Sequence, residues 1–152
     1  MSLQTKGTIK ANFVTGAKPT QQQFYDLIES QIGCIGKLIG ANMNTTADQI
    51  INLTGGTKFI ITDIVFTNAS VNLNTANIGD FYTGVGRSGN LIAQFLTGSF
   101  AFLTTALKFI NYITLGFSIG FDIAPSTLYF SITTPQGAPA TCDIYIFGFP
   151  TA

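Results

Sequence analysis

Apolar and polar residues alternate along two segments in the C-terminal part of the chain, "LYFSITT" (128–134) and "CDIYIFG" (142–148). A period of two indicates a β-strand, because successive side chains of a strand point to opposite faces. We predict a strand at each segment, with one face buried. The residues expected on the buried faces are Leu128, Phe130 and Ile132 in the first strand and Cys142, Ile144 and Ile146 in the second.

Further strands are predicted upstream. The segment "KFIITDIVFTN" (58–68) is rich in β-branched and aromatic residues, and apolar residues occupy both of its faces, so we expect a strand covered on both sides. Four shorter segments follow at intervals of roughly ten residues: "DFYTGVG", "NLIAQFLTG", "FAFLTTALKF" and "NYITLGFSI". This rhythm predicts one antiparallel β-sandwich or jelly roll of about eight strands. "NLIAQFL" is taken as a strand, with a helical turn as the alternative.

A helical period appears only near the N-terminus. Thr20 stands three residues before Gln23, which is the spacing of a capping box, and Gly33 supplies a stop. We therefore predict a helix over residues 21–32. At about twelve residues it would be marginal alone in water, so it must dock on a partner surface. Its apolar face consists of Phe24, Leu27, Ile28 and Ile32.

The chain between helix and strands, "GCIGKLIGANMNTTAD" (33–48), mixes small and apolar residues without a clean period. It is typical of a packed connector, and the β region is expected to start near Gln49. The predicted organisation is an arm, helix and connector over 1–48, serving attachment, and a single β-sandwich domain over 49–152. A length of 152 residues leaves room for one domain with a short appendage.

Composition argues against most forms of chemistry. Charged residues make up 9% of the chain, seven cations balance seven anions, and His is absent. No net field or basic run would attract nucleic acid. Without His, and with only Cys34 and Cys142 as soft ligands, we expect no metal and no cofactor. We also expect no disulfide and no cleaved leader. No membrane insertion is expected either, because Gly98, Thr and Ser interrupt the most apolar run without a charge, residues 91–107.

One motif resembles part of a nucleotide-binding site, and the carboxylates must be considered as catalytic acids. "GVGRSG" (84–89) matches G-x-G-x-x-G, but no helix is predicted after it and no acid lies about 20 positions on, so we predict a hairpin or inter-strand loop. The carboxylates form no pair on one strand face, and each is expected to be a cap or turn residue rather than a catalytic acid. They are Asp26, Glu29, Asp48, Asp63, Asp80, Asp122 and Asp143.

Aromatic content changes the picture more than charge does. Fourteen Phe and five Tyr exceed what one thin sandwich core usually holds, so some should lie in a subunit interface. Interface cores are depleted in charged residues, and a monomer with this composition would risk aggregation. We therefore expect an assembled protein.

The N-terminal pattern F-x-T-G-A-K-P-T-x-x-Q-F-x-D-L-I-x-S resembles a segment of structural proteins from tailed bacteriophages and prophages of Bacteroidetes-like hosts. It is present here as Phe13, Thr15 to Thr20, Gln23, Phe24, Asp26, Leu27, Ile28 and Ser30. The segments "ITDIVFTNASVNLNTA", "GDFYTG" and "LYFSITTPQGAPATCDIYIFG" are similar to the β-domain that accompanies it. This resemblance implies a non-enzymatic virion component, with the arm and helix for attachment and an exposed β-domain that is usually trimeric.

Because the chain carries no long repetitive shaft, we expect a homotrimeric capsid-surface decoration or head-fibre protein, located in the virion and assembled in the host cytoplasm. Its other partners would be virion proteins of the capsid or tail. The expected docking anchors are Phe13, Phe24, Leu27 and Ile28. In the alternative interpretation these four side chains pack under their own β-domain.

Two further functions are kept open. A tail-fibre knob would bind a host receptor or glycan, with loop aromatics as sugar-stacking platforms. Those aromatics would be Phe81, Tyr82, Tyr112 or Phe121. A depolymerase of surface polysaccharide would need two convergent carboxylates, for which Asp80 and Asp122 are the residues to test.

Overall fold

The computed structural model describes residue 20 and residues 33–95, 99–106, 109–111, 122–123 and 126–151. Over these residues the chain is mainly β, with nine strands and one short 3₁₀ helix, η1. The elements are β1 (Gly33–Asn42), β2 (Gln49–Asn52), β3 (Phe59–Thr67), β4 (Asn77–Gly84), β5 (Ser88–Phe95), η1 (Ser99–Phe102), β6 (Phe109–Asn111), β7 (Asp122–Ile123), β8 (Thr127–Thr134) and β9 (Thr141–Pro150). The helix predicted over 21–32 lies outside the described residues.

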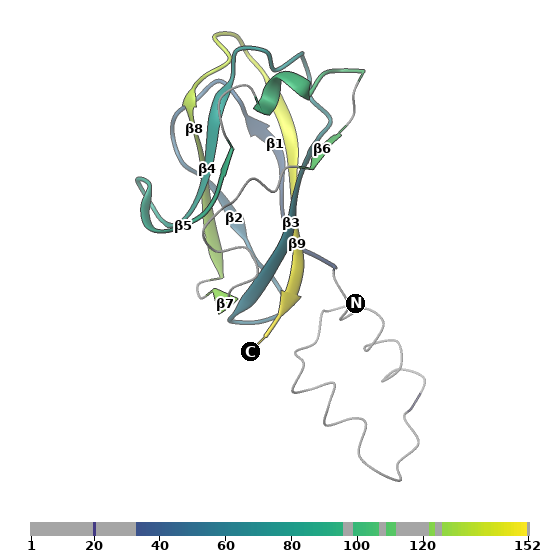
Figure 1. The fold of residues 1–152 in the computed structure, drawn as a ribbon, viewed down its shortest axis with the longest axis vertical. Coiled ribbons are helices and arrows are strands. Elements are labelled where there is room, and N and C mark those ends of the chain that lie inside the picture. Colours follow the sequence, from purple (N-terminus) through teal and green to yellow (C-terminus); the bar gives the residue numbers. More distant parts are fainter. Residues whose placement is uncertain are drawn as a thin grey trace.

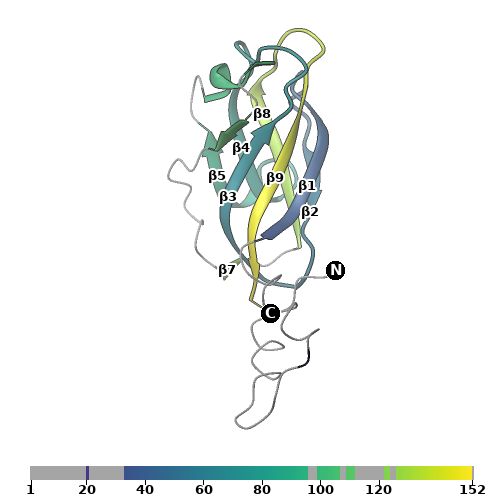
Figure 2. The ribbon, with the colours of Figure 1, turned by 90° about the vertical axis from the view of Figure 1, so that its right-hand side faces the viewer.

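The strands form two antiparallel sheets. The first, called here the β9 sheet, has the order β1-β9-β3-β6, with β7 also paired to β3. The second, the β8 sheet, has the order β2-β8-β4-β5. The two sheets lie face to face in both ribbon views, with β9 and β8 each near the middle of its sheet (Figures 1 and 2).

Strand pairing is nested around one turn. β4 pairs with β5, β3 with β6, β2 with β8 and β1 with β9, and all four pairs are antiparallel. The chain therefore runs outward and back as one long hairpin centred on the turn between β4 and β5. The strands of these four pairs alternate between the two sheets along each side of the hairpin, and the short β7 joins β6 in the β9 sheet.

A cluster of phenylalanines joins the two sheets. The ring of Phe66 on β3 lies 4.9 Å from that of Phe95 on β5 and 5.1 Å from that of Phe100 on η1, centroid to centroid, in edge-to-face geometry. Phe66 also approaches Phe81 and Phe130 at 6.1 and 5.8 Å. Such pairs add about 0.5–1.5 kcal/mol each beyond area burial. Six phenylalanines are fully buried, so the core takes a large share of the aromatic content.

The strands predicted from alternation are confirmed. The segments at 128–134 and 142–148 form β8 and β9, with their predicted inward residues buried. The segment at 58–68 forms β3 as predicted, but one of its faces is buried and the other only half-buried, so the expected cover on both sides is partial. "NLIAQFL" lies in β5 and is a strand, and "GVGRSG" spans the hairpin turn from β4 to β5. The segment beginning at Phe100 differs from expectation, since residues 99–102 form η1.

The predicted connector over 33–48 is wrong in its first ten residues, which form β1 and pair with β9. The β region therefore starts at Gly33, ahead of the boundary expected at residues 48 and 49. Register shifts between Cys34 and Gly36 and between Leu38 and Ala41 explain the error. Each bulge inserts an unpaired residue, and this breaks the two-residue period by which a strand is recognised.

Candidate functional site

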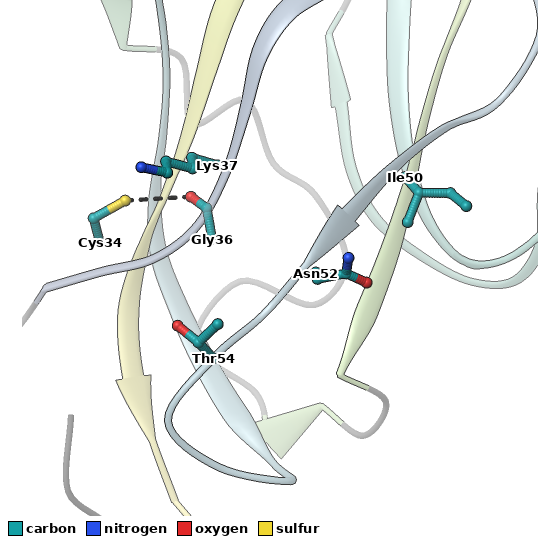
Figure 3. A pocket seen from close by; sticks show the side chains of 6 residues that line it. All are labelled: Cys34, Gly36, Lys37, Ile50, Asn52 and Thr54. Atoms are coloured by element: carbon teal, nitrogen blue, oxygen red, sulfur yellow. Dashed lines mark hydrogen bonds between the residues drawn. The ribbon is translucent and has the colours of Figure 1, made fainter. Parts of the chain in front are cut away.

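A cavity of about 410 Å³ lies at the seam between the two sheets, where the edge strands β1 and β2 meet (Figure 3). It is lined by Cys34, Gly36 and Lys37 from β1 and by Ile50, Asn52 and Thr54 from β2 and the residues after it. One ammonium, one amide and one hydroxyl are its main polar groups. The Cys34 thiol donates to the Gly36 carbonyl at 3.3 Å. No carboxylate lines this cavity, so it holds no acid–base pair.

The seam is fastened on both sides of the cavity. At one end the Thr54 N–H donates to the Ile35 carbonyl at 2.8 Å, next to a bridge between Gly36 and Leu53. At the other end the Gln49 side chain accepts from the Asn42 N–H at 2.7 Å and donates to the Asn42 carbonyl at 2.9 Å. The Gln49 amide thus substitutes for a neighbouring strand and covers part of an exposed β1 edge.

The turn between β4 and β5 curves out from the β8 sheet and back toward β2 (Figure 1). At its tip the Gly86 N–H donates to the Asp48 carboxylate. Arg87 donates from Nε to Ser131 Oγ at 3.0 Å and from Nη2 to Thr133 Oγ1 at 2.9 Å. Arg87 has a φ of +58°, a left-handed conformation that side-chain residues rarely adopt, so these bonds hold a strained turn across β8.

Asp80 is buried beneath this turn. Its side chain is 4% exposed, its Oδ2 lies 4.0 Å from Arg87 Nη1, and its Oδ1 has no hydrogen-bond partner. Burial raises the pKa of the neighbouring Tyr82, the negative charge of Asp80 raises it further, and Arg87 opposes the rise. The expectation that Asp80 is a cap or turn residue is wrong, because it lies within strand β4 and inside an ionic cluster.

On the outer surface of the β8 sheet, two tyrosines face each other across neighbouring strands. Tyr129 on β8 pairs with Tyr82 on β4, and Ile50 on β2 lies on the other side of Tyr129 and is 55% exposed. This row lies one pair of residues away from Asp80 and Ser131. The outer surface of the β8 sheet, called the β8 face, thus combines two rings with hydroxyl groups, a guanidinium and a buried carboxylate.

The outer surface of the β9 sheet has a different character. Tyr145, Phe147 and Phe149 alternate with the buried residues of β9 and point outward, half-buried. In the register of the sheet, Val65 lies opposite Tyr145, Asp63 opposite Phe147 and Ile60 opposite Phe149 on β3, and Lys37 lies opposite Tyr145 on β1. These seven residues are called the β9 face, which Figure 2 views from outside.

Asp143 marks the polar end of β9. Its carboxylate accepts from the Gly40 N–H and from the Asn68 side-chain amide, both at 2.8 Å. Gly40 lies in the irregular part of β1 and Asn68 has a φ of +53°, so one carboxylate ties a bulge to a loop. Asp143 is therefore structural, and it too lies in a strand rather than in a cap or turn.

The structure describes only some of the residues predicted as sites. The anchors Phe13, Phe24, Leu27 and Ile28 lie outside the described residues, as do Tyr112 and Phe121. Phe81, expected on an exposed loop, is fully buried in the core, so a sugar-stacking role for it is wrong. Tyr82 does face outward, but from a strand. The β9 face was missed as a set, although the alternation of 143–149 carried its signal.

The described residues contain no group of three or more Cys, Asp or Glu placed to hold a metal ion. None of the helices described is long and apolar enough to cross a membrane. Cys34 and Cys142 are both free thiols, the first exposed and the second buried.

Comparisons with protein-family models, with curated proteins and with solved structures found no match for this chain.

Proposed function

We propose that this chain is a non-enzymatic structural protein of a bacteriophage virion, a homotrimeric capsid-surface decoration or head-fibre protein attached through its N-terminal arm. The observation that carries the proposal is the β9 face, where three aromatic side chains of one central strand point away from the core. Outward aromatic surface with few charges is typical of a face that is covered in an assembly. The resemblance of residues 13–30 to phage structural proteins supplies the kind of assembly.

We further propose that the β-domain is a sandwich of the jelly-roll type. The nested pairs β1·β9, β2·β8, β3·β6 and β4·β5 support this topology, because a jelly roll is a long antiparallel hairpin wrapped into two sheets. Jelly rolls recur in capsid and lectin domains, so the fold suits a virion surface without specifying the function.

Attachment is assigned in this proposal to the arm, through Phe13, Phe24, Leu27 and Ile28. The arm leads directly into β1, an edge strand at the cavity-lined seam. A short apolar helix needs a docking surface to persist, and another virion protein of the capsid or tail would provide it. The non-enzymatic part is supported by Asp80, whose carboxylate is enclosed beside Arg87 rather than open to a substrate.

The proposal is tested in two steps on the full chain. Sedimentation equilibrium should give three times the chain mass of 16.2 kDa, and cryo-EM of particles from the same host should place the density on the capsid surface. A double change, Phe24→Ala with Leu27→Ala, should abolish particle binding and leave the trimer intact, because the proposed anchors lie outside the β-domain. A monomer, or a double variant that still decorates particles, would contradict the proposal.

A second function, a tail-appendage knob that binds a host receptor or glycan, is favoured by the β8 face. Tyr82 and Tyr129 are paired across strands, and Arg87 is 35% exposed beside them. Aromatic rings next to charged hydrogen-bonding groups are the chemistry by which proteins bind sugars. Glycan-array binding by the full chain that is lost in Tyr129→Ala but kept in Tyr145→Ala would select this function over simple decoration.

A further inference from the structure

We infer that the β9 face is the surface by which copies of this chain associate, with Lys37 of one copy meeting Asp63 of the next. The inference rests on the proposed homotrimer and adds the surface and the contact that would form it. The occupant is a second copy of the chain.

The apolar part of this face is continuous across strands. Tyr145 lies opposite Val65, and four residues further along β9, Phe149 lies opposite Ile60; Phe147 lies between them on β9, opposite Asp63. These side chains are half-buried and belong to the two adjacent strands β9 and β3 near the sheet centre. Removing such a patch from water is favourable by about 25 cal/mol for each Å² of apolar surface, which is the driving force expected of a subunit interface.

Charge placement makes the face complementary to itself. Lys37 is exposed on β1, on one side of the aromatic row, and Asp63 lies on β3, on the other side. When three copies are arranged in a ring about an axis parallel to β9, with this face turned inward, the Lys37 side of one copy meets the Asp63 side of its neighbour. Opposite charges then meet at the margins while the aromatic residues fill the centre.

The β8 face is a poorer surface for self-association. The β4–β5 turn folds back over it and is fastened to Asp48, Ser131 and Thr133. The turn projects above the strands of the β8 sheet, and Val85 at its tip is 66% exposed. A centrally apolar surface is present on the β9 sheet, and on the β8 sheet the turn interrupts the surface.

The test compares matched tyrosines in the full chain. Tyr145 and Tyr129 are both half-buried, both point outward, and both lie on strands inside their sheets. In analytical ultracentrifugation, Tyr145→Ser and Phe147→Ser should each raise the trimer dissociation constant about tenfold or more, because central aromatic residues dominate interfaces. Tyr129→Ser should change it by less than about twofold, since surface substitutions outside an interface are nearly neutral.

A charge exchange provides a second test, which remains valid if the aromatic variants fail to fold. Lys37→Glu and Asp63→Lys should each weaken the trimer about tenfold by placing like charges together, and the double variant should return to within about threefold of the wild type. Circular dichroism confirms that each variant is folded. A wild-type trimer that persists unchanged in all the β9-face variants would overturn this inference and leave the proposed function standing, whereas a wild-type monomer would overturn both.

Discussion

The two outer faces of this protein start from the same pattern and end with different chemistry. β8 and β9 both alternate between buried and outward residues, and both lie inside their sheets. The outward side of β9 carries Tyr145, Phe147 and Phe149, whereas that of β8 carries Tyr129, Ser131 and Thr133 beneath an arginine. Alternation therefore determines which residues point away from the core, while the neighbouring chain determines what those residues contact.

The clearest case is Ser131, which points away from the core and is nevertheless 1% exposed. The β4–β5 turn crosses β8 and places Arg87 over it. No such segment among the described residues is bonded across the outward side chains of Tyr145 or Phe147. One face is thus closed by a turn of its own chain, and we propose that the other is closed by a second copy.

The largest expected effect comes from a substitution in the core between the two sheets, on which both outer faces depend. Phe66→Ala should lower the free energy of unfolding by about 4 kcal/mol, because a large buried ring leaves a cavity between the sheets. Chemical denaturation of the full chain measures this loss. Phe102→Ala is the matched control, since Phe102 is 61% exposed and should cost less than about 0.5 kcal/mol. Equal losses in both variants would show that Phe66 does not join the sheets.

A smaller change should disturb the β9 face alone. A Cβ on Gly148 would collide with the Ile60 main-chain carbonyl, so Gly148→Ala must separate β9 from β3. We expect a loss of about 3 kcal/mol, because a backbone atom cannot move aside as a flexible side chain can. Gly137→Ala is the control: nothing lies within 4 Å of its added Cβ, and only its φ of +83° opposes the change, at about 1 kcal/mol. Thermal and denaturant unfolding would contradict the prediction if the order were reversed.

Removing the Arg87 cation tests the interactions that hold the β8 face together. Arg87→Ala should destabilise the fold by about 2 kcal/mol, because Asp80 is left buried without a positive neighbour and two hydrogen bonds are lost. Adding Asp80→Asn should recover part of this loss. A spectroscopic readout gives opposite signs: the pKa of Tyr82 should rise in Arg87→Ala and fall in Asp80→Asn. NMR of labelled tyrosine follows it, and shifts of the same sign would contradict the proposed cluster.

The effect that is smallest at neutral pH concerns a buried thiol of the core rather than the outer faces. Burial, with a further contribution from Asp143, raises the pKa of Cys142 from 9.0 to about 12. The folded state therefore holds a proton that the unfolded state loses, so this contribution to stability is complete below pH 9 and declines as the pH rises toward 12. Cys142→Ala should show a shallower decline over that range. At neutral pH a thiol reagent should label exposed Cys34 and spare Cys142 until unfolding.

Much of the fold could be predicted where one face of a strand is buried in regular register. β8 and β9 satisfy this condition, and their inward residues follow the period of two, whereas β3 has a register shift between Ile61 and Asp63 and was predicted from its β-branched and aromatic residues. β1 does not satisfy the condition, because two bulges reset its period and its glycines carry no side chain to read. Phe81 was misplaced for a related reason, since "DFYTG" resembles a loop until its pairing with both β5 and β8 buries the ring.

From composition and a two-residue period, which are local properties, the sequence predicts a charge-poor, antiparallel β-protein without histidine chemistry. It could not determine that Asp80 is enclosed or that Arg87 crosses to β8. These contacts join residues tens of positions apart, and they depend on how a strained turn bends over a neighbouring strand. Which outer face is closed by its own chain and which is left aromatic was decided only by the tertiary structure.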